Sequence, residues 1–109
     1  MDDPDVKLHA GASVSGEADI QGDVTIHART VVHPKAVIIA EPGHPIVIGS
    51  GNIIEEASRI TSAAGSVRIG DSNHIQVGCH LDSCQLGDAN TVEPGCKCLG
   101  PSAWRPQVL

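Results

Sequence analysis

Aliphatic residues recur every six positions along this chain, in groups of three. The recurrence is unbroken from Leu8 to Ile38, and new groups of three start at Ile48, Ile69 and Leu86. The complete set is Leu8, Val14, Ile20, Ile26, Val32, Ile38, Ile48, Ile54, Ile60, Ile69, Ile75, Leu81, Leu86, Val92 and Cys98. No stretch shows sustained helical periodicity. A period of six predicts a short strand followed by a corner in every unit.

Three such units make one triangular coil, and the sequence marks where each coil begins. A triplet with apolar first and third residues, Cys84 included, occupies residues 6–8, 24–26, 46–48, 67–69 and 84–86, and its middle residue is polar except at Val47. Coils stack by parallel strand pairing about 4.8 Å apart, so that like residues form columns. The chain is therefore predicted to be all-β, a parallel β-helix of hexapeptide repeats with about five coils. We expect it to span residues 6–103, between an acidic tail at 1–5 and an irregular tail at 104–109.

Small or turn-forming residues follow each aliphatic residue at the fourth position. At the first corner of the coils these are Ala12, Thr30, Asn52, Asn73 and Asn90. The three asparagines form one predicted column, and each comes three residues after a glycine. Two roles remain open for them. Their side-chain amides form hydrogen bonds between coils, as in asparagine ladders, or each residue supplies a left-handed backbone conformation that a tight corner needs.

Composition and charge narrow the class of protein. Aromatic residues make up 1% of the chain, which indicates a narrow core filled by aliphatic side chains. The net charge is −6 with only 7 Lys and Arg, which argues against nucleic acid or an anionic membrane as a partner. No stretch approaches the 18 apolar residues of a membrane span, and the acidic start does not resemble a signal peptide. The expected location is the cytoplasm.

The four cysteines are expected to be reduced there and to fill space in the core. Cys79 and Cys96 fall in the same corner column one coil apart, a spacing that permits a disulfide. Cys84 and Cys98 take inward positions. The paired CxxC spacing of common zinc sites is missing. We therefore expect neither a metal nor a cofactor.

Two segments resemble the γ-class carbonic anhydrases. They read "IGSGNIIEEASRIT" from Ile48 and "IGDSNHIQVGCHLDSC" from Ile69. The three zinc-binding histidines of that family align with Thr61, Val77 and Asp82, none of which is histidine, so the resemblance implies a scaffold whose zinc site is lost. Hexapeptide acyltransferases also share the repeat and need a histidine base. None of the six histidines lies in a long predicted loop.

A closer resemblance covers residues 6–95. The stretch "GDVTIHARTVVHPKAVIIAEPGHPIVIGSGNIIEE", from Gly22 to Glu56, is similar to the β-helical subunits of the pointed-end complex of dynactin, and Val77 to Glu93 continues the match. The insertion "AEPGHP" and the run "IEE" make it specific, because the repeat requires neither. The family's further coils and C-terminal helix have no counterpart after Pro94, so the resemblance implies a chain shortened at its C-terminus.

This resemblance implies a left-handed coil and a non-enzymatic structural subunit of dynactin, associated with the cytoskeleton. Its expected partners are the sister β-helical subunit and other pointed-end subunits, and indirectly dynein and cargo adaptors. An enzyme like the γ-carbonic anhydrases or the hexapeptide acyltransferases remains the alternative. Direct insertion into a membrane is not expected.

A structural subunit needs a contact surface, and strand alternation indicates where it lies. Residues that flank the inward aliphatics point outward, and most of them are polar. The second and third coils are exceptions, because aliphatic residues occupy outward positions there. The candidates are Val31 and Ile53 in one column, Val37 and Ile39 on another face, and Val47 on the first face.

Overall fold

The computed structural model describes residues 6–63, 65–99 and 103–104, and these residues form strands and turns without a helix. Their strands belong to three parallel sheets. The first sheet contains β1 (Lys7–Leu8), β4 (Val24–Ile26), β7 (Ile46–Ile48), β10 (Val67–Ile69), β13 (Gln85–Leu86) and β16 (Ala103–Trp104). The second contains β2 (Ser13–Val14), β5 (Val31–Val32), β8 (Ile53–Ile54), β11 (His74–Ile75) and β14 (Thr91–Val92). The third contains β3 (Asp19–Gln21), β6 (Val37–Ile39), β9 (Arg59–Thr61), β12 (His80–Asp82) and β15 (Lys97–Leu99).

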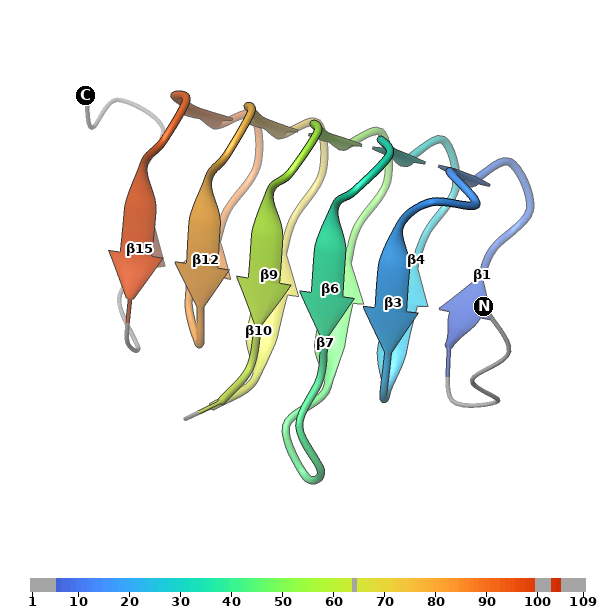
Figure 1. Cartoon of the computed structure of the whole chain (residues 1–109), viewed down its shortest axis with the longest axis horizontal. Helices are drawn as coiled ribbons and strands as arrows, with labels where there is room; N and C mark the ends of the chain where they lie inside the picture. The colour runs from blue at the N-terminus through green and yellow to red at the C-terminus, as the bar shows by residue number, and fades with distance from the viewer. Residues whose placement is uncertain (1–5, 64, 100–102, 105–109) are drawn as a thin grey trace.

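The chain visits the three sheets in rotation and thereby builds a stack of coils (Figure 1). β1 to β3 form the first coil, and β13 to β15 form the fifth. The strand pairs are parallel, and each strand from β1 to β13 pairs with the strand three places further along the chain. This confirms the predicted parallel β-helix of about five coils. Trp104, expected in the tail, lies in the short strand β16, and the two predicted tails otherwise fall outside the described residues.

The inward columns match the six-residue period. Ile20, Ile38, Ile60, Leu81 and Cys98 are consecutive neighbours across the third sheet, and the other two sheets show the same arrangement. Most of these side chains are buried almost completely. Leu8 departs from the prediction, because 43% of it is exposed. It lies in β1, which pairs only with β4 among the described residues.

The corners show which residues turn the chain. At the first corner, a residue with positive φ stands in every coil immediately before the small residue; these are Gly11, Arg29, Gly51, Ser72 and Ala89. The φ angles of Ser72 and Ala89 are 59° and 57°. The left-handed role considered for the asparagines is therefore wrong. The residue before each asparagine adopts the left-handed conformation, and the asparagine side chain is buried.

The insertion before the third coil forms a loop between β6 and β7, which projects at the lower edge of Figure 1. Ser62, a buried residue directly after β9 in the third coil, forms hydrogen bonds with this loop. Its hydroxyl donates a hydrogen bond to the carbonyl oxygen of His44 over 2.7 Å and accepts one from the backbone N–H of Glu41 over 2.9 Å. Two hydrogen bonds thus attach the base of the projecting loop to the third coil.

Candidate functional site

Outward-pointing aliphatic residues cluster on two coils of the β-helix. Val31 and Ile53 are direct neighbours in the second sheet, where β5 pairs with β8. Ile53 is 38% exposed and Val31 is half-buried. The same column carries Ser13 before them and His74 and Thr91 after them. The aliphatic part of this column is therefore confined to the second and third coils.

The third sheet carries a second aliphatic pair. Val37 and Ile39 lie on either side of the buried Ile38 in β6, and both are half-buried. Their neighbours in the coils below and above are polar, namely Asp19, Gln21, Arg59 and Thr61. Val47 lies in the first sheet between Thr25 and Arg68. These five candidates thus sit on three different faces of the same two coils.

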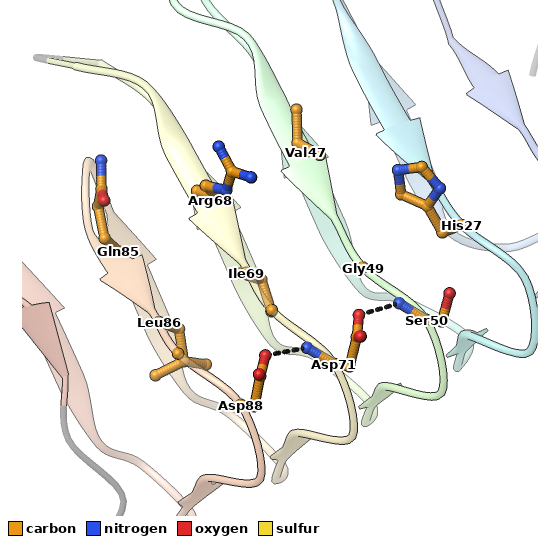
Figure 2. A pocket seen from close by; sticks show the side chains of 12 residues that line it. His27, Val47, Gly49, Ser50, Arg68, Ile69, Asp71, Gln85, Leu86 and Asp88 are labelled. Atoms are coloured by element: carbon orange, nitrogen blue, oxygen red, sulfur yellow. Dashed lines mark hydrogen bonds between the residues drawn. The ribbon is translucent and has the colours of Figure 1, made fainter.

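A partly open groove of about 610 Å³ runs beside Val47 across the first sheet (Figure 2). Val47, Arg68 and Gln85 form one side of it, and Ser50, Asp71 and Asp88 belong to the corner on the other side. His27 contributes to the lining from the second coil. The groove therefore combines an aliphatic residue, a guanidinium group and a polar corner.

The two carboxylates of this corner are engaged with the backbone. Asp71 accepts a hydrogen bond from the N–H of Ser50 over 2.8 Å, and Asp88 accepts one from the N–H of Asp71 over 2.7 Å (Figure 2). Each carboxylate also occupies the space beside a glycine of the preceding coil. A Cβ atom on Gly49 would lie 2.3 Å from the Asp71 carboxylate. These aspartates connect the coils, and the glycines are required to make room for them.

The asparagine column binds backbone groups of the next coil. The Oδ1 atom of Asn52 accepts from the N–H of Asn73, and that of Asn73 accepts from the N–H of Asn90, both over 2.8 Å. The Nδ2 atom of Asn52 donates to the carbonyl oxygen of Gly70 over 2.7 Å. Thr30 takes the same role one coil earlier through its hydroxyl group. The amides thus link coils through the backbone and not through one another.

Four of the histidines make structural contacts. His74 forms an ion pair with Glu55 of the preceding coil. The rings of His9 and His27 stack with their centroids 4.3 Å apart. The Nδ1 atom of His44 lies 3.1 Å from the carbonyl oxygen of Ser62. In each case the contact joins neighbouring coils.

The three positions that align with zinc ligands are not arranged as a metal site. Thr61 and Asp82 are neighbours in β9 and β12, and Asp82 accepts hydrogen bonds from the Ser83 hydroxyl and the Ala63 N–H. Val77 lies at the second corner with 47% of its surface exposed. Within residues 6–63, 65–99 and 103–104, no three or more His, Cys, Asp and Glu side chains group together as a metal site.

All four cysteines are free thiols in this structure. Cys79 donates a hydrogen bond to the carbonyl oxygen of Glu93 over 2.9 Å. Burial raises the pKa of the Cys79 thiol. Burial, together with a hydrogen bond that the protonated Cys84 thiol makes to Cys98, raises the pKa of Cys84 to about 12. Cys84 and Cys98 occupy the core, as their inward positions predicted.

Sequence reasoning overlooked Asp71, Asp88 and Glu55 as residues that join coils. The aspartates could have been found, because each stands one coil after a glycine in the repeated phrase "IGxxN". The contact between His74 and Glu55 runs diagonally between columns, so the column pattern contains no signal for it. The described part of the chain has no helix of the length and apolar character that a membrane crossing requires.

Comparison with known proteins relates the chain to one group of curated sequences. It is 52% identical to dynactin subunit 6 of Danio rerio in an alignment of 87 residues that covers 68% of this chain and 44% of the relative. It is 46% identical to dynactin subunit 6 of Xenopus tropicalis, over 69% of this chain and 43% of that protein. The counterpart from Nematostella vectensis is 59% identical over 51 residues, 47% of this chain and 27% of the relative. No protein-family profile matches the chain.

These matches confirm the resemblance to the β-helical dynactin subunits. All three relatives carry the name of a dynactin subunit. The match spans less than half the length of each of these relatives.

Solved structures show the same fold in more distant proteins. PerB from Caulobacter crescentus, solved with CoA and GDP-perosamine, superposes with a TM-score of 0.63 at 19% identity, over 89% of this chain and 49% of that one. The acetyltransferase domain of PglB from Neisseria gonorrhoeae, in complex with acetyl coenzyme A, gives a TM-score of 0.53 at 19% identity, over 87% of this chain and 54% of that one. At such identity the likeness concerns the fold alone.

Proposed function

The chain is a homologue of dynactin subunit 6, and on that premise we propose that it is a non-enzymatic subunit of dynactin. The observation that carries this proposal is the 52% identity to the Danio rerio protein over 87 residues. The finer part of the proposal is that the chain belongs to the pointed-end complex and pairs there with the sister β-helical subunit. In that place it helps dynein and dynactin to engage cargo adaptors on the cytoskeleton.

The geometry of the outward aliphatic residues supports a role in subunit contact. Val31 and Ile53 form a continuous aliphatic strip over two coils, and strips of this kind on a polar surface mark contact sites. Sheet faces pack against flat partners at a spacing of about 10 Å, which suits contact between two β-helices. Val37 and Ile39 offer a second strip on the third sheet.

Double substitutions with lysine test this surface. Val31→Lys with Ile53→Lys places two charges on the second sheet, and Val37→Lys with Ile39→Lys does so on the third. The buried columns beneath them stay unchanged. The matched control is Thr91→Lys with Gln85→Lys, which adds the same charge at exposed polar positions of the fifth coil.

Each variant is expressed with an affinity tag in cells, and recovery of dynactin subunits is quantified by mass spectrometry. The wild-type chain and the control are expected to recover the complex equally. At least one aliphatic double variant is expected to lose tenfold or more, while circular dichroism shows that it is folded. If both folded double variants recovered dynactin subunits as well as the wild-type chain does, the assignment of this contact surface would be wrong. Failure of the wild-type chain itself to recover dynactin subunits would contradict the function.

An assay for CO₂ hydration with measured zinc content tests the enzymatic alternative. The proposal predicts no zinc-dependent turnover. Turnover that is abolished by changing His74 or His80 would contradict a purely structural role. The relevant control is the same assay after removal of metal by a chelator.

A further inference from the structure

We propose that Cys79 and Cys96 form an oxidisable pair, which a hydroperoxide converts into a disulfide that joins the fourth and fifth coils. The two residues stand at the same corner, immediately before β12 and β15. The segments that lead into these strands lie side by side along the upper edge of Figure 1. This site is independent of the proposed subunit function.

The backbone fixes the relation between the two residues. His80 and Lys97 are register partners, and the N–H of His80 donates to the carbonyl oxygen of Cys96 over 2.9 Å. Residues 79 and 96 are therefore stacked neighbours, about 4.8 Å apart as in other parallel pairs. Disulfides need a Cα–Cα distance of roughly 4.4–6.8 Å. The coil spacing already satisfies this requirement.

The Cys79 sulfur points toward the fifth coil. It donates to the carbonyl oxygen of Glu93 over 2.9 Å, and the N–H of Cys96 donates to that same oxygen over 3.1 Å. The two cysteines thus share one acceptor. Ser58, one coil earlier, uses the same position to donate to the carbonyl oxygen of Gln76, so the inter-coil direction of this side chain belongs to the corner itself.

Exposure decides the order of the reaction. Cys96 is half-buried, whereas only 1% of Cys79 is exposed, so that the oxidant reaches Cys96 first. The Cys96 thiolate attacks the peroxide oxygen, the O–O bond breaks, and a sulfenic acid forms as hydroxide or alkoxide leaves. The Cys79 sulfur then attacks the sulfenic sulfur and gives up its proton, and the hydroxyl group leaves as water. Two thiols are oxidised and one peroxide is reduced.

The other two cysteines supply an internal comparison. Cys84 and Cys98 are also close, because the Cys84 thiol donates to the carbonyl oxygen of Cys98. Both lie in the core, with 2% and 6% of their surface exposed. An oxidant in solution therefore meets neither of them, and this pair is expected to stay reduced while the corner pair reacts.

Peptide mapping after mild hydrogen peroxide treatment of the full chain tests the assignment. Trypsin together with a protease that cleaves after Asp and Glu places each cysteine in its own peptide, namely 72–82, 83–88, 89–97 and 98–109. The expected product is a reducible link between 72–82 and 89–97 within one molecule. Thermal unfolding of the oxidised protein is expected to shift upward by about 5 °C or more, and a reductant should reverse the shift.

Variants separate this pair from general cysteine chemistry. Cys96→Ala should abolish both the link and the thermal shift, and Cys79→Ala should leave Cys96 as a sulfenic or higher acid. Cys98→Ala should change neither the link nor the shift. A link between 83–88 and 98–109, a link between molecules, or overoxidation of Cys96 without a link would each overturn the proposal. Cys96 is half-buried, so its alanine variant remains informative if Cys79→Ala fails to fold.

Discussion

Replacing Asn52 by alanine tests whether the asparagine column holds the coils together. Asn52 is fully buried, and its amide satisfies two backbone groups of the next coil, the N–H of Asn73 and the carbonyl oxygen of Gly70. Alanine suits the site, because Asn52 does not have a positive φ angle. The substitution therefore removes two hydrogen bonds and leaves the backbone conformation accessible.

The magnitude follows from the partners that are left behind. A buried polar group without a partner costs about 1–3 kcal/mol. Two such groups are stranded, and loss of the asparagine's own desolvation cost offsets part of the sum, so we expect a loss of about 2–4 kcal/mol. That is a large share of the roughly 5–15 kcal/mol by which domains are stable.

Asn73 provides the matched comparison. Its Oδ1 atom accepts from the N–H of Asn90, but its Nδ2 atom has no hydrogen-bond partner among the described residues. Asn73→Ala therefore strands one backbone group and removes one unsatisfied amide, for an expected loss of about 1 kcal/mol. The sequence alone ranks the two asparagines equally, since they occupy the same column.

Equilibrium unfolding in urea, followed by circular dichroism and by a second probe, measures both variants. Gln85→Ala, at an exposed position, serves as control and should change stability by less than about 0.5 kcal/mol. The reasoning is refuted if Asn52→Ala costs no more than Asn73→Ala, or if both match the control. A changed denaturant slope would indicate separate unfolding of coils, as stacked repeats permit.

Two further predictions concern the first corner and the core. Gly49→Ala places a Cβ atom 2.3 Å from the Asp71 carboxylate and should lower the free energy of unfolding by about 2 kcal/mol or more. The control is Gly87→Ala, whose Cβ atom would lie 3.9 Å from its nearest neighbour and which should change this free energy by less than about 0.5 kcal/mol. Equal losses for the two variants in denaturant unfolding would contradict the prediction. Because the pKa of Cys84 rises from 9.0 to about 12 on folding, the unfolded chain loses this proton first, so stability should fall between about pH 9 and pH 12, by up to about 1.4 kcal/mol per pH unit. Cys84→Val, which repeats the residue of Val67 in the coil before, should reduce that slope, and an unchanged slope in pH-dependent unfolding would refute the assignment.

The architecture could be predicted from periodicity because a β-helix repeats its environment in every coil. Ile54, for example, lies between Val32 and Ile75 in the second sheet, and all three positions have the same kind of environment. The requirement for an aliphatic side chain therefore recurs and is visible in the sequence. The outward aliphatic residues were found by the same rule. Val31 and Ile53 point outward as neighbours because alternation and stacking are both regular.

The candidate site was harder to predict where contacts depart from the repeat. The ion pair of His74 with Glu55 joins two different columns. The groove beside Val47 is lined by the side chains of Arg68 and Gln85 and by one glycine from each of three successive coils, namely Gly49, Gly70 and Gly87. Such features depend on the relative placement of neighbouring columns, which a period of six residues does not encode.

The sequence by itself determined the coil, its five repeats and the side of each strand that faces the core, because burial of aliphatic side chains imposes a periodic pattern that can be read directly. Tertiary structure alone decided the hydrogen-bond partners. It put the left-handed turn on Ser72 and not on Asn73, and it left Leu8 partly exposed in the first coil. The physical reason is that burial acts on each residue separately, whereas a hydrogen bond requires two groups that only the stacked coils bring within 3 Å of each other.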